Sequence, residues 1–275
     1  MSLDPIKRKE RYGHLKAQRA VMENYWQDLA DYIIPNKNSI TTKSFEGEER
    51  NLQLFDNTGP QSNETLAGAL HGLMTSPFAP WFDLTSGDPE LDNKDEVRLW
   101  FQDSSKKMHA ALSDSNFQTE IHETYLDLGC FGTNALLCEE DARTLFRFSS
   151  THIGDVYIAE NNKGIVDEVM REFEWSAKLV VAEFGIEEVP DIIRQAYEKG
   201  LDEKFKILHH VYANDDKSKK ENPKYAQFEF ISVYGLLDHD KNLSIKGFHE
   251  MPYIVSRWSK VAGEVYGRSP GMTAL

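Results

Sequence analysis

Apolar residues in the first half of the chain recur every three or four positions, which is the spacing of one face of an α-helix. In residues 5–34 this stripe includes Leu15, Trp26 and Leu29. Four helices are predicted on this basis. The first helix covers residues 5–34 and is stopped by Pro35, and the second is capped by Ser62 or Asn63 and ended by Ser76–Pro77. The third begins after a cap at Asp92–Asn93, and the fourth follows Ser115 and ends at Gly129.

The second half of the chain alternates apolar and polar residues, which is the period of a β-strand. Strands are predicted over residues 135–138, 145–148, 156–159, 165–173, 205–212, 225–237 and 253–258, with one short strand, 81–84, inside the helical half. The turn residues Asn161–Gly164 predict an antiparallel meander. Two short helices interrupt it near 176–200, and the second opens at Pro190 and closes at Gly200.

These elements predict an α+β fold, in which amino-terminal amphipathic helices precede an antiparallel strand-rich region with a helical insertion. The predicted division is a mainly helical region over residues 1–130 and a strand-rich region over residues 131–275. No repeat or low-complexity linker separates them, so they are predicted to be lobes of one composite domain. The charged tract Asp215–Pro223 is predicted to be an exposed loop, either ordered or disordered.

Composition narrows the range of partners. The chain has 45 acidic and 31 basic residues, a net charge of -14. Sequence-independent affinity for nucleic acid comes from lysine and arginine, so this chain is not predicted to be a generic DNA binder. No stretch approaches about eighteen apolar residues, and Lys7–Lys9 is not followed by the apolar run of a secretory signal. A soluble protein made in the cytoplasm is therefore predicted.

Candidate metal sites fail on their spacing. Asp238–Asn242 begins like an EF-hand loop, but Leu243 stands where that loop needs glycine, and His249 where it needs glutamate. A tight turn between two strands is predicted there instead. The neighbours His209 and His210 would point to opposite faces of a strand, so a histidine cluster that includes them is disfavoured, and surface or core histidines are predicted.

Other cofactor signals are missing from the sequence. Cys130 and Cys138 lack C-x-x-C spacing, so they are predicted to be reduced, small apolar residues. Neither G-x-x-x-x-G-K-[ST] nor G-x-G-x-x-G occurs. The sequence therefore predicts no metal, no cofactor and no ATP site.

One motif invites an enzymatic interpretation. Gly267–Gly271 matches G-x-S-x-G, the elbow that exposes the serine nucleophile of α/β-hydrolases, and would make Ser269 catalytic. In that elbow the residue after the serine donates its backbone N–H to the oxyanion, but Pro270 has no N–H. The catalytic acid and histidine should also follow the serine, and no ionisable side chain follows Ser269 here. A hydrolase is therefore disfavoured.

The same segment carries a more specific likeness. Arg257–Trp258, followed by Gly263–Glu264–Val265–Tyr266–Gly267–Arg268–Ser269–Pro270, resembles the head-to-tail connecting (portal) proteins of short-tailed, T7-like bacteriophages. The resemblance extends along the chain in order and spacing, through Tyr32–Pro35, Leu54–Thr58, Leu66–Leu73, Pro80–Leu84, Asp127–Thr133 and Asn162–Asp167. Such portals continue well past this motif, so the resemblance implies an amino-terminal, wing-like portion without the carboxyl-terminal stem and later parts.

The resemblance implies a structural protein and not an enzyme. Portals form a ring, usually a dodecamer, at one capsid vertex, through which viral DNA is packaged and ejected. The implied partners are further copies of the chain, a terminase that supplies the motor, capsid and scaffolding proteins, tail adaptor proteins, and double-stranded DNA that passes without sequence-specific binding. The implied location is the virion, and the host cytoplasm during assembly. An acidic duct wall would let DNA move with little friction, although a solvated acidic surface explains the charge equally well.

The roles of the motif residues stay open. In one interpretation the glycines and proline fix a turn into a helix, with the aromatic residues packed beneath it. In the other, Glu264 and Arg268 contact a neighbouring subunit of the ring. The predicted structural or intersubunit residues are Arg257, Trp258, Gly263, Glu264, Tyr266, Gly267, Arg268, Ser269 and Pro270, and none is predicted to be catalytic. A monomeric or small-oligomer phage-related binding module without a DNA conduit is the alternative function.

Overall fold

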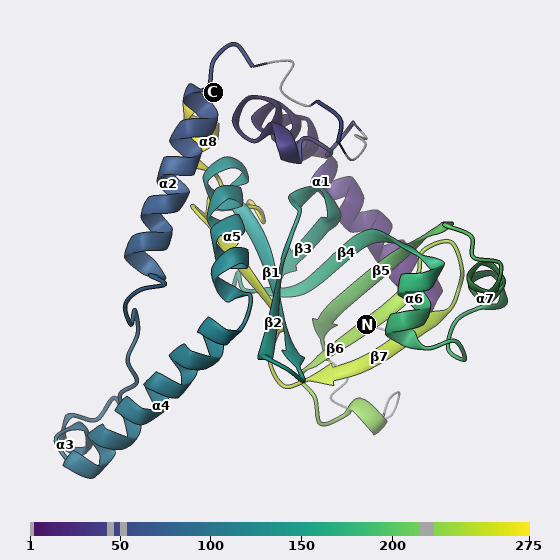
Figure 1. The fold of residues 1–275 in the computed structure, drawn as a ribbon. Helices are drawn as coiled ribbons and strands as arrows, with labels where there is room; N and C mark the ends of the chain where they lie inside the picture. Colours follow the sequence, from purple (N-terminus) through teal and green to yellow (C-terminus); the bar gives the residue numbers. More distant parts are fainter. Residues whose placement is uncertain (1–2, 43–46, 50–53, 215–222) are drawn as a thin grey trace.

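The structure is a computed structural model that describes residues 3–42, 47–49, 54–214 and 223–275. Two antiparallel sheets form its centre, and helices cover them on both sides (Figure 1). The long first helix lies behind the larger sheet. A group of helices from the first half of the chain lies against the smaller sheet, and two short helices cover the far end of the larger one.

The helices follow the predicted order. Helix α1 is interrupted after Ile33 by Pro35, which begins a short 3-10 turn, and α5 ends where Gly132 adopts a left-handed conformation with φ of 75°. The α-helices are α1 (Pro5–Ile33), α2 (Thr58–Met74), α3 (Pro89–Asp92), α4 (Asp95–Asp114), α5 (Phe117–Phe131), α6 (Ala177–Phe184), α7 (Asp191–Glu198) and α8 (Pro270–Ala274), and 3-10 turns lie at Pro35–Lys37, Ile153–Asp155 and Pro223–Tyr225.

The strands form two separate sheets. The three-stranded sheet has the order β2-β1-β8, and the five-stranded sheet has the order β3-β4-β5-β6-β7. Every pairing within these sheets is antiparallel. The strands are β1 (Thr133–Asp141), β2 (Leu145–Thr151), β3 (Val156–Glu160), β4 (Val166–Ser176), β5 (Lys204–Ala213), β6 (Phe230–Leu236), β7 (Asn242–Phe248) and β8 (Tyr253–Arg257).

Alternation along β1 explains how the smaller sheet joins two layers. Ala135 and Leu137 belong to the main buried cluster, together with Val169 and Val211 of the larger sheet. Leu136, between them, points to the other face and packs with Phe117 of α5 and Phe148 of β2. Successive residues of a strand face opposite ways, so β1 packs against the larger sheet on one side and against the helices on the other.

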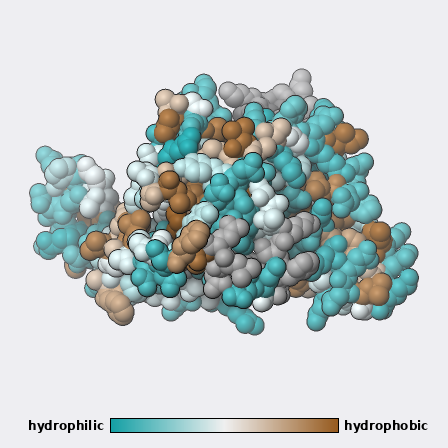
Figure 2. All heavy atoms as spheres, turned by 90° about the horizontal axis from the view of Figure 1, so that it is seen from above, coloured by the Kyte–Doolittle hydropathy of each residue, from teal (hydrophilic) through white to brown (hydrophobic). Residues whose placement is uncertain are grey.

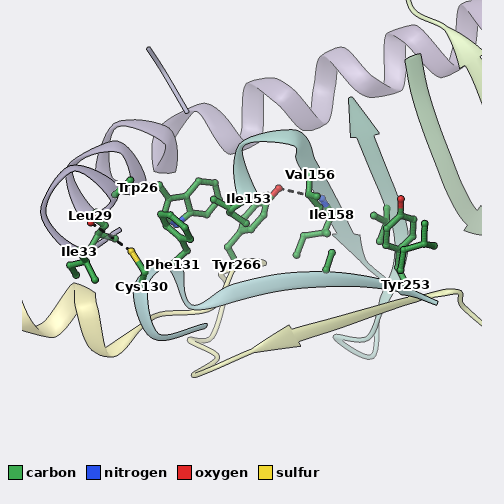
Figure 3. Close-up of a cluster of buried hydrophobic side chains, with 14 of the residues drawn as sticks. Trp26, Leu29, Ile33, Cys130, Phe131, Ile153, Val156, Ile158, Tyr253 and Tyr266 are labelled. Atoms are coloured by element: carbon green, nitrogen blue, oxygen red, sulfur yellow. Dashed lines mark hydrogen bonds between the residues drawn. The ribbon is translucent and has the colours of Figure 1, made fainter. Parts of the chain in front are cut away.

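Helix α1 covers the outer face of the larger sheet with its first half. Tyr12 and Leu15 pack on Tyr157, Met170 and Leu208 of strands β3, β4 and β5. The second half of α1 passes beyond the sheet edge. There Trp26, Leu29 and Ile33 enter the main cluster instead, and this single helix therefore links the two ends of the body (Figure 3).

Two predicted helix starts are wrong. Helix α2 begins at Thr58, before the predicted caps Ser62 and Asn63, because the Asp56 carboxylate already accepts the Thr58 N–H. Asn63 is buried inside the helix, where its side-chain amide donates to the carbonyl of Leu126. The third long helix, α4, begins at Asp95, and the predicted cap Asp92 ends α3 and accepts hydrogen bonds from Ser86 instead.

The predicted end of the fourth helix is also wrong, by three residues. Gly129 lies inside α5, and Gly132 follows its end. A Cβ atom on Gly129 would lie 2.1 Å from the side-chain oxygen of Asn63, so this glycine permits close packing of α5 against α2. The sequence shows two glycines near the helix end, and the second one, Gly132, ends the helix.

Several strand predictions need correction. Residues 81–84 form no strand, because Trp81 stacks on Phe117 and the Leu84 N–H is bonded to the Ser105 hydroxyl instead of to a neighbouring strand. The predicted single meander is two sheets, since β1 pairs with β2 on one side and with β8 on the other. The strand predicted from residue 225 begins only at Phe230, and β7 was not predicted as a strand of its own.

The α+β class and the two-helix insertion are confirmed. The turn at Asp238–Asn242 joins β6 to β7, as predicted. The division into lobes at about residue 130 stays a prediction. Of the charged tract, residues 215–222 lie outside the described part of the chain.

His209 is buried between the two sheets. Its ring stacks on Tyr234 with centroids 3.8 Å apart, and its nitrogens lie 2.8 Å from the Tyr253 hydroxyl and 2.8 Å from the Ser232 hydroxyl. Burial lowers the pKa of His209 well below its usual value, and the positive charge of Arg171 acts in the same direction. The fold therefore holds this histidine in its neutral form.

We expect the free energy of unfolding to fall as the pH drops below about 6.5, because His209 takes up a proton in the unfolded chain but not in the folded one. This residue contributes a loss of up to about 1.4 kcal/mol per pH unit. In a His209→Gln variant the slope between pH 6.5 and pH 5 should be shallower, as measured by urea unfolding. Equal slopes for the His209 variant and the parent would contradict this account.

Candidate functional site: the carboxyl-terminal motif

The segment from Arg257 to Pro270 runs from the end of β8 to the start of α8 and folds back on itself. Ser259 and Arg268 pair as an isolated antiparallel bridge, and the Arg268 N–H donates to the Ser259 carbonyl at 2.7 Å. Between them the chain turns at Gly263, whose φ is 85°. We call residues 257–271 the motif segment.

The motif segment lies in backbone contact with the end of α5. A Cβ atom on Gly132 would lie 2.6 Å from the carbonyl carbon of Arg268, and one on Gly267 would lie 2.3 Å from the carbonyl oxygen of Gly132. Real Cβ atoms essentially never lie within 3.0 Å of such neighbours. Gly132 also has positive φ. Both positions therefore need glycine, Gly132 for its conformation and its packing and Gly267 for its packing.

Hydrogen bonds fix this contact on both sides. The Gly267 N–H donates to the Thr133 hydroxyl at 2.7 Å, and the Trp258 N–H donates to the Gly132 carbonyl at 2.9 Å. The Ser269 hydroxyl donates to the Cys130 carbonyl at 2.6 Å, which is one of the carbonyls left free at the end of α5. The motif segment thus caps the α5 carboxyl terminus.

Tyr266 extends the contact to α1 and β3. It is buried, its ring packs edge-on against Trp26 with centroids 5.0 Å apart, and its hydroxyl accepts the Ile158 N–H at 3.2 Å (Figure 3). Burial raises the pKa of Tyr266 to about 12. A second tyrosine, Tyr25, donates to the Met272 carbonyl at 2.9 Å. Both α1 and the sheet are therefore tied to the motif segment.

Arg257 holds the turn between β3 and β4. Its guanidinium pairs with Glu160 and donates to the carbonyls of Val265 and Gly164 at 3.1 and 3.2 Å. Lys260 lies 2.8 Å from the same carboxylate. Removal of water from its surroundings lowers the pKa of Arg257, which nevertheless stays charged at neutral pH. This cluster is a structural tie and leaves the guanidinium without a role in binding an external anion.

Glu264 and Arg268 form an ion pair with each other, with Arg268 Nε 2.6 Å from a Glu264 carboxylate oxygen. This bonding lowers the pKa of Glu264 and raises that of Arg268. Both side chains are about one third exposed, so the pair lies on the surface of this chain. Trp258 was predicted to pack beneath the turn, but it is 42% exposed.

Ser269 is not placed as a nucleophile. It is buried, and its hydroxyl oxygen accepts the Met272 N–H at 2.9 Å while donating to Cys130. This is the geometry of a helix N-cap, here for α8. Pro270 occupies the first position of that helix, where its missing N–H costs nothing. The residues that resemble a hydrolase elbow therefore make a helix start.

An apolar cavity of about 420 Å³ lies beside α8. Tyr32 and Ile33 of α1, Leu66 of α2, and Pro270 and Leu275 are among the residues that line it. Asp56 is the one acidic side chain in its lining among the described residues, and its carboxylate is bonded to Thr58. The cavity offers apolar contact and contains no pair of titratable groups suited to acid–base chemistry.

Metal-binding groups are not assembled in the part of the chain that the structure describes. No set of three His, Cys, Asp or Glu side chains there is placed to hold a metal ion. His209 and His210 face opposite sides of β5, as alternation predicts: His210 bonds to Glu168 beneath α1, and His209 faces Tyr253 of the other sheet. Within the same residues no helix has the length and apolar character needed to cross a membrane.

Comparison with known proteins decides the family. The family model for "Bacteriophage head to tail connecting protein" matches residues 7–275, which is nearly the whole chain. The chain belongs to this connector family. The resemblance predicted from the motif segment is thereby confirmed.

Two relatives show what share of the relatives' length this chain covers. The "Probable portal protein" of Bordetella phage BPP-1 is 30% identical over 269 residues, and the "Portal protein" of Salmonella phage epsilon15 is 31% identical over 270 residues. Each alignment covers 96% of this chain and 48% of the relative. The chain therefore spans about half the length of the curated relatives that it matches.

Sequence reasoning found the motif segment of this connector chain but not what it touches. Asp127–Thr133 and Arg257–Pro270 both carried the family resemblance, and the structure brings the end of the first against the second. Gly132 was missed as a site residue. Its signal was present, because a glycine just after a helical stripe is typical of a left-handed helix end.

We expect Gly132→Ala to destabilise the chain far more than Gly263→Ala does. Both glycines have positive φ, so each alanine costs about 1–2 kcal/mol of backbone strain. Only at Gly132 does the new methyl group also meet backbone atoms, whereas nothing lies within 4 Å of a Cβ on Gly263. Urea unfolding of the two variants measures the difference, and equal losses would show that the close approach is not a constraint.

Ser269→Ala should cost about 1–2 kcal/mol in the free energy of unfolding, because it removes the α8 cap and leaves the Cys130 carbonyl without its donor. Ser269→Thr should keep most of that stability, since threonine also caps. Neither change should alter the rate of ester hydrolysis in the protein preparation. A hydrolytic rate that disappears with Ser269→Ala but survives in Ser269→Thr would instead establish a catalytic serine.

Proposed function

We propose that this chain is the amino-terminal part of a phage portal, which forms a ring at one capsid vertex and conducts double-stranded DNA into and out of the head. The observation that carries the proposal is the match of the connector family to residues 7–275. The names of the two relatives support it, because one is printed as a portal protein and the other as a probable portal protein. The structure is compatible with it, since the motif residues serve to hold the fold together.

The proposed partners follow from this role. Further copies of the chain complete the ring, a terminase supplies the motor, capsid and scaffolding proteins surround the vertex, and tail adaptor proteins attach below it. The protein would act in the virion and, during assembly, in the host cytoplasm. A ring of this kind uses heterologous contacts, which close only if the rotation between neighbours divides the circle.

The net charge of -14 suits a duct that must not retain DNA. Lysine and arginine that neutralise phosphates would hold the duplex, and the affinity would rise steeply at low salt. A wall with excess carboxylates repels phosphate instead and lowers the barrier to sliding. We propose that part of this acidic surface faces the channel.

The alternative function is a phage-related binding module that stays a monomer or small oligomer. An enzymatic role through Ser269 has little to support it, because the hydroxyl is buried in a helix cap. We propose that the chain has no catalytic activity of its own.

Electron microscopy with light scattering, on the protein at the full length that its gene encodes, tests the proposal. We expect closed rings with a central hole wide enough for a DNA duplex, and a scattering mass equal to an integral number of chains. Purified terminase should bind the rings. A monomer at every concentration tested would contradict the portal function and favour the binding module.

A further inference from the structure

Helices α3 and the start of α4 form an arm that projects from the body. We define the arm as residues 86–101. It lies at the lower left of Figure 1, away from both sheets, and appears as a separate lobe at the left in Figure 2. No side chain of residues 76–104 is buried. The arm therefore receives almost none of its stability from the core of its own chain.

The arm nevertheless exposes large apolar side chains. Leu99 is 60% exposed and Trp100 is 64% exposed, next to each other on α4, and Leu91 of α3 is 40% exposed. Single exposed apolar residues are ordinary, but a tryptophan and two leucines exposed on one short projection are typical of a protein contact. A partner that covers Trp100 would gain the large burial energy of an aromatic anchor.

The charge of the arm restricts what can cover it. Its side chains include more acids than bases: Asp88, Glu90, Asp92, Asp95 and Glu96 against Lys94 and Arg98. Copies of a chain with a net charge of -14 repel one another, so a contact between copies needs a local region of opposite sign. The partner surface should therefore be basic, and should be flat enough to accept a tryptophan.

The first half of α1 offers an exposed lysine beside a flat apolar strip. Between residues 5 and 22 Glu10 is the one acidic residue, and Lys7 is an exposed basic side chain. Three further basic side chains reach the surface there and pair with carboxylates of the same chain: Lys9 with Asp240, Arg11 with Glu168 and Lys16 with Glu172. The outward face of this half also carries Gly13 and Ala17, followed by Val21, which is 84% exposed. Small side chains leave a shallow apolar strip in which an indole ring can lie close to the helix backbone.

The two surfaces lie on different sides of the chain. Helix α1 runs behind the larger sheet, with its first half toward the end where α6 and α7 lie, and the arm is at the opposite end (Figure 1). One surface of a chain can therefore meet the other surface of the next chain, which is a heterologous contact. Repetition of such a contact produces a ring or a filament and not a symmetric dimer.

We propose that the arm of one copy docks on the outward face of α1 of the next copy, with Trp100 against the Gly13–Ala17 strip and the acidic side chains of the arm facing Lys7. The proposal rests on the portal function, since it names the surfaces by which copies of the chain associate. It assigns the contact to residues 86–101 and to the first half of α1, outside the motif segment.

Cysteine cross-linking in the full-length protein tests the contact. Trp100→Cys and Ala17→Cys are combined in a Cys138→Ser background, since Cys138 is half-buried and Cys130 is buried. Under mild oxidation the double variant should give a ladder of covalent dimers, trimers and higher species on a denaturing gel. A mixture of the two single variants should stop at the dimer, and each single variant alone should give none.

Charge reversal provides a second measurement. Asp95→Lys with Glu96→Lys should reduce the fraction of chains in rings at least tenfold at a concentration where the parent is half assembled. Adding Lys7→Glu should restore part of that loss. Ile165→Asp, at a residue 58% exposed outside both surfaces, is the matched control for an exposed apolar position, and Leu99→Asp should weaken assembly where this control does not.

The outcomes separate this proposal from the portal function. Rings that form in the double cysteine variant without any ladder, and that are insensitive to charge reversal, would overturn the arm contact and leave the portal function standing. A parent protein that forms no rings at all would contradict the portal function itself. A ladder whose length is limited to dimers in the double variant would indicate a symmetric contact and would also overturn the proposal.

Discussion

The fold depends on one backbone contact, between the end of α5 and the motif segment. At Gly132 and Gly267 the two segments approach so closely that neither position has room for a side chain. This approach lets the Gly267 N–H reach Thr133 and the Ser269 hydroxyl reach the Cys130 carbonyl. Polar groups of the helix end thereby find partners within the protein, which is what allows the surrounding apolar cluster to close.

Other parts of the body are attached through this contact. Tyr266 reaches from the motif segment to Trp26 of α1 and to the Ile158 N–H of β3, and Arg257 reaches the turn after β3. The segment that most resembles an enzyme motif thus contains a helix cap, a buried tyrosine, a largely buried ion pair of Arg257 with Glu160 and a surface ion pair of Glu264 with Arg268.

Local sequence signals predicted an element well where residues within or next to it mark its ends. Pro35 and Pro190 marked helix limits correctly, and the alternation along β3, β4 and β5 gave their strands. The errors arose where tertiary contacts decide the conformation of a segment. Asn63 has the chemistry of a cap but is buried against α5, and Trp81–Leu84 has the composition of a strand but packs on a helix. The split into two sheets depends on β8, from far along the chain, pairing with β1, and no local pattern shows that.

The site was predictable as a motif but not as a contact. Resemblance selected residues 257–270, and the missing N–H of Pro270 argues against a hydrolase on the sequence alone. Neither signal could show that the motif segment packs against Gly132, or that Glu264 and Arg268 pair within the chain.

Native-state hydrogen exchange tests the central claim most directly. If the contact between α5 and the motif segment holds the fold together, the amide hydrogens of Gly267 and Trp258 should exchange only through global unfolding, with the same free energy as buried amides of β4 and β5. Exchange of these two amides at a much lower free energy, while the sheets stay protected, would show that the motif segment opens independently and would contradict this account.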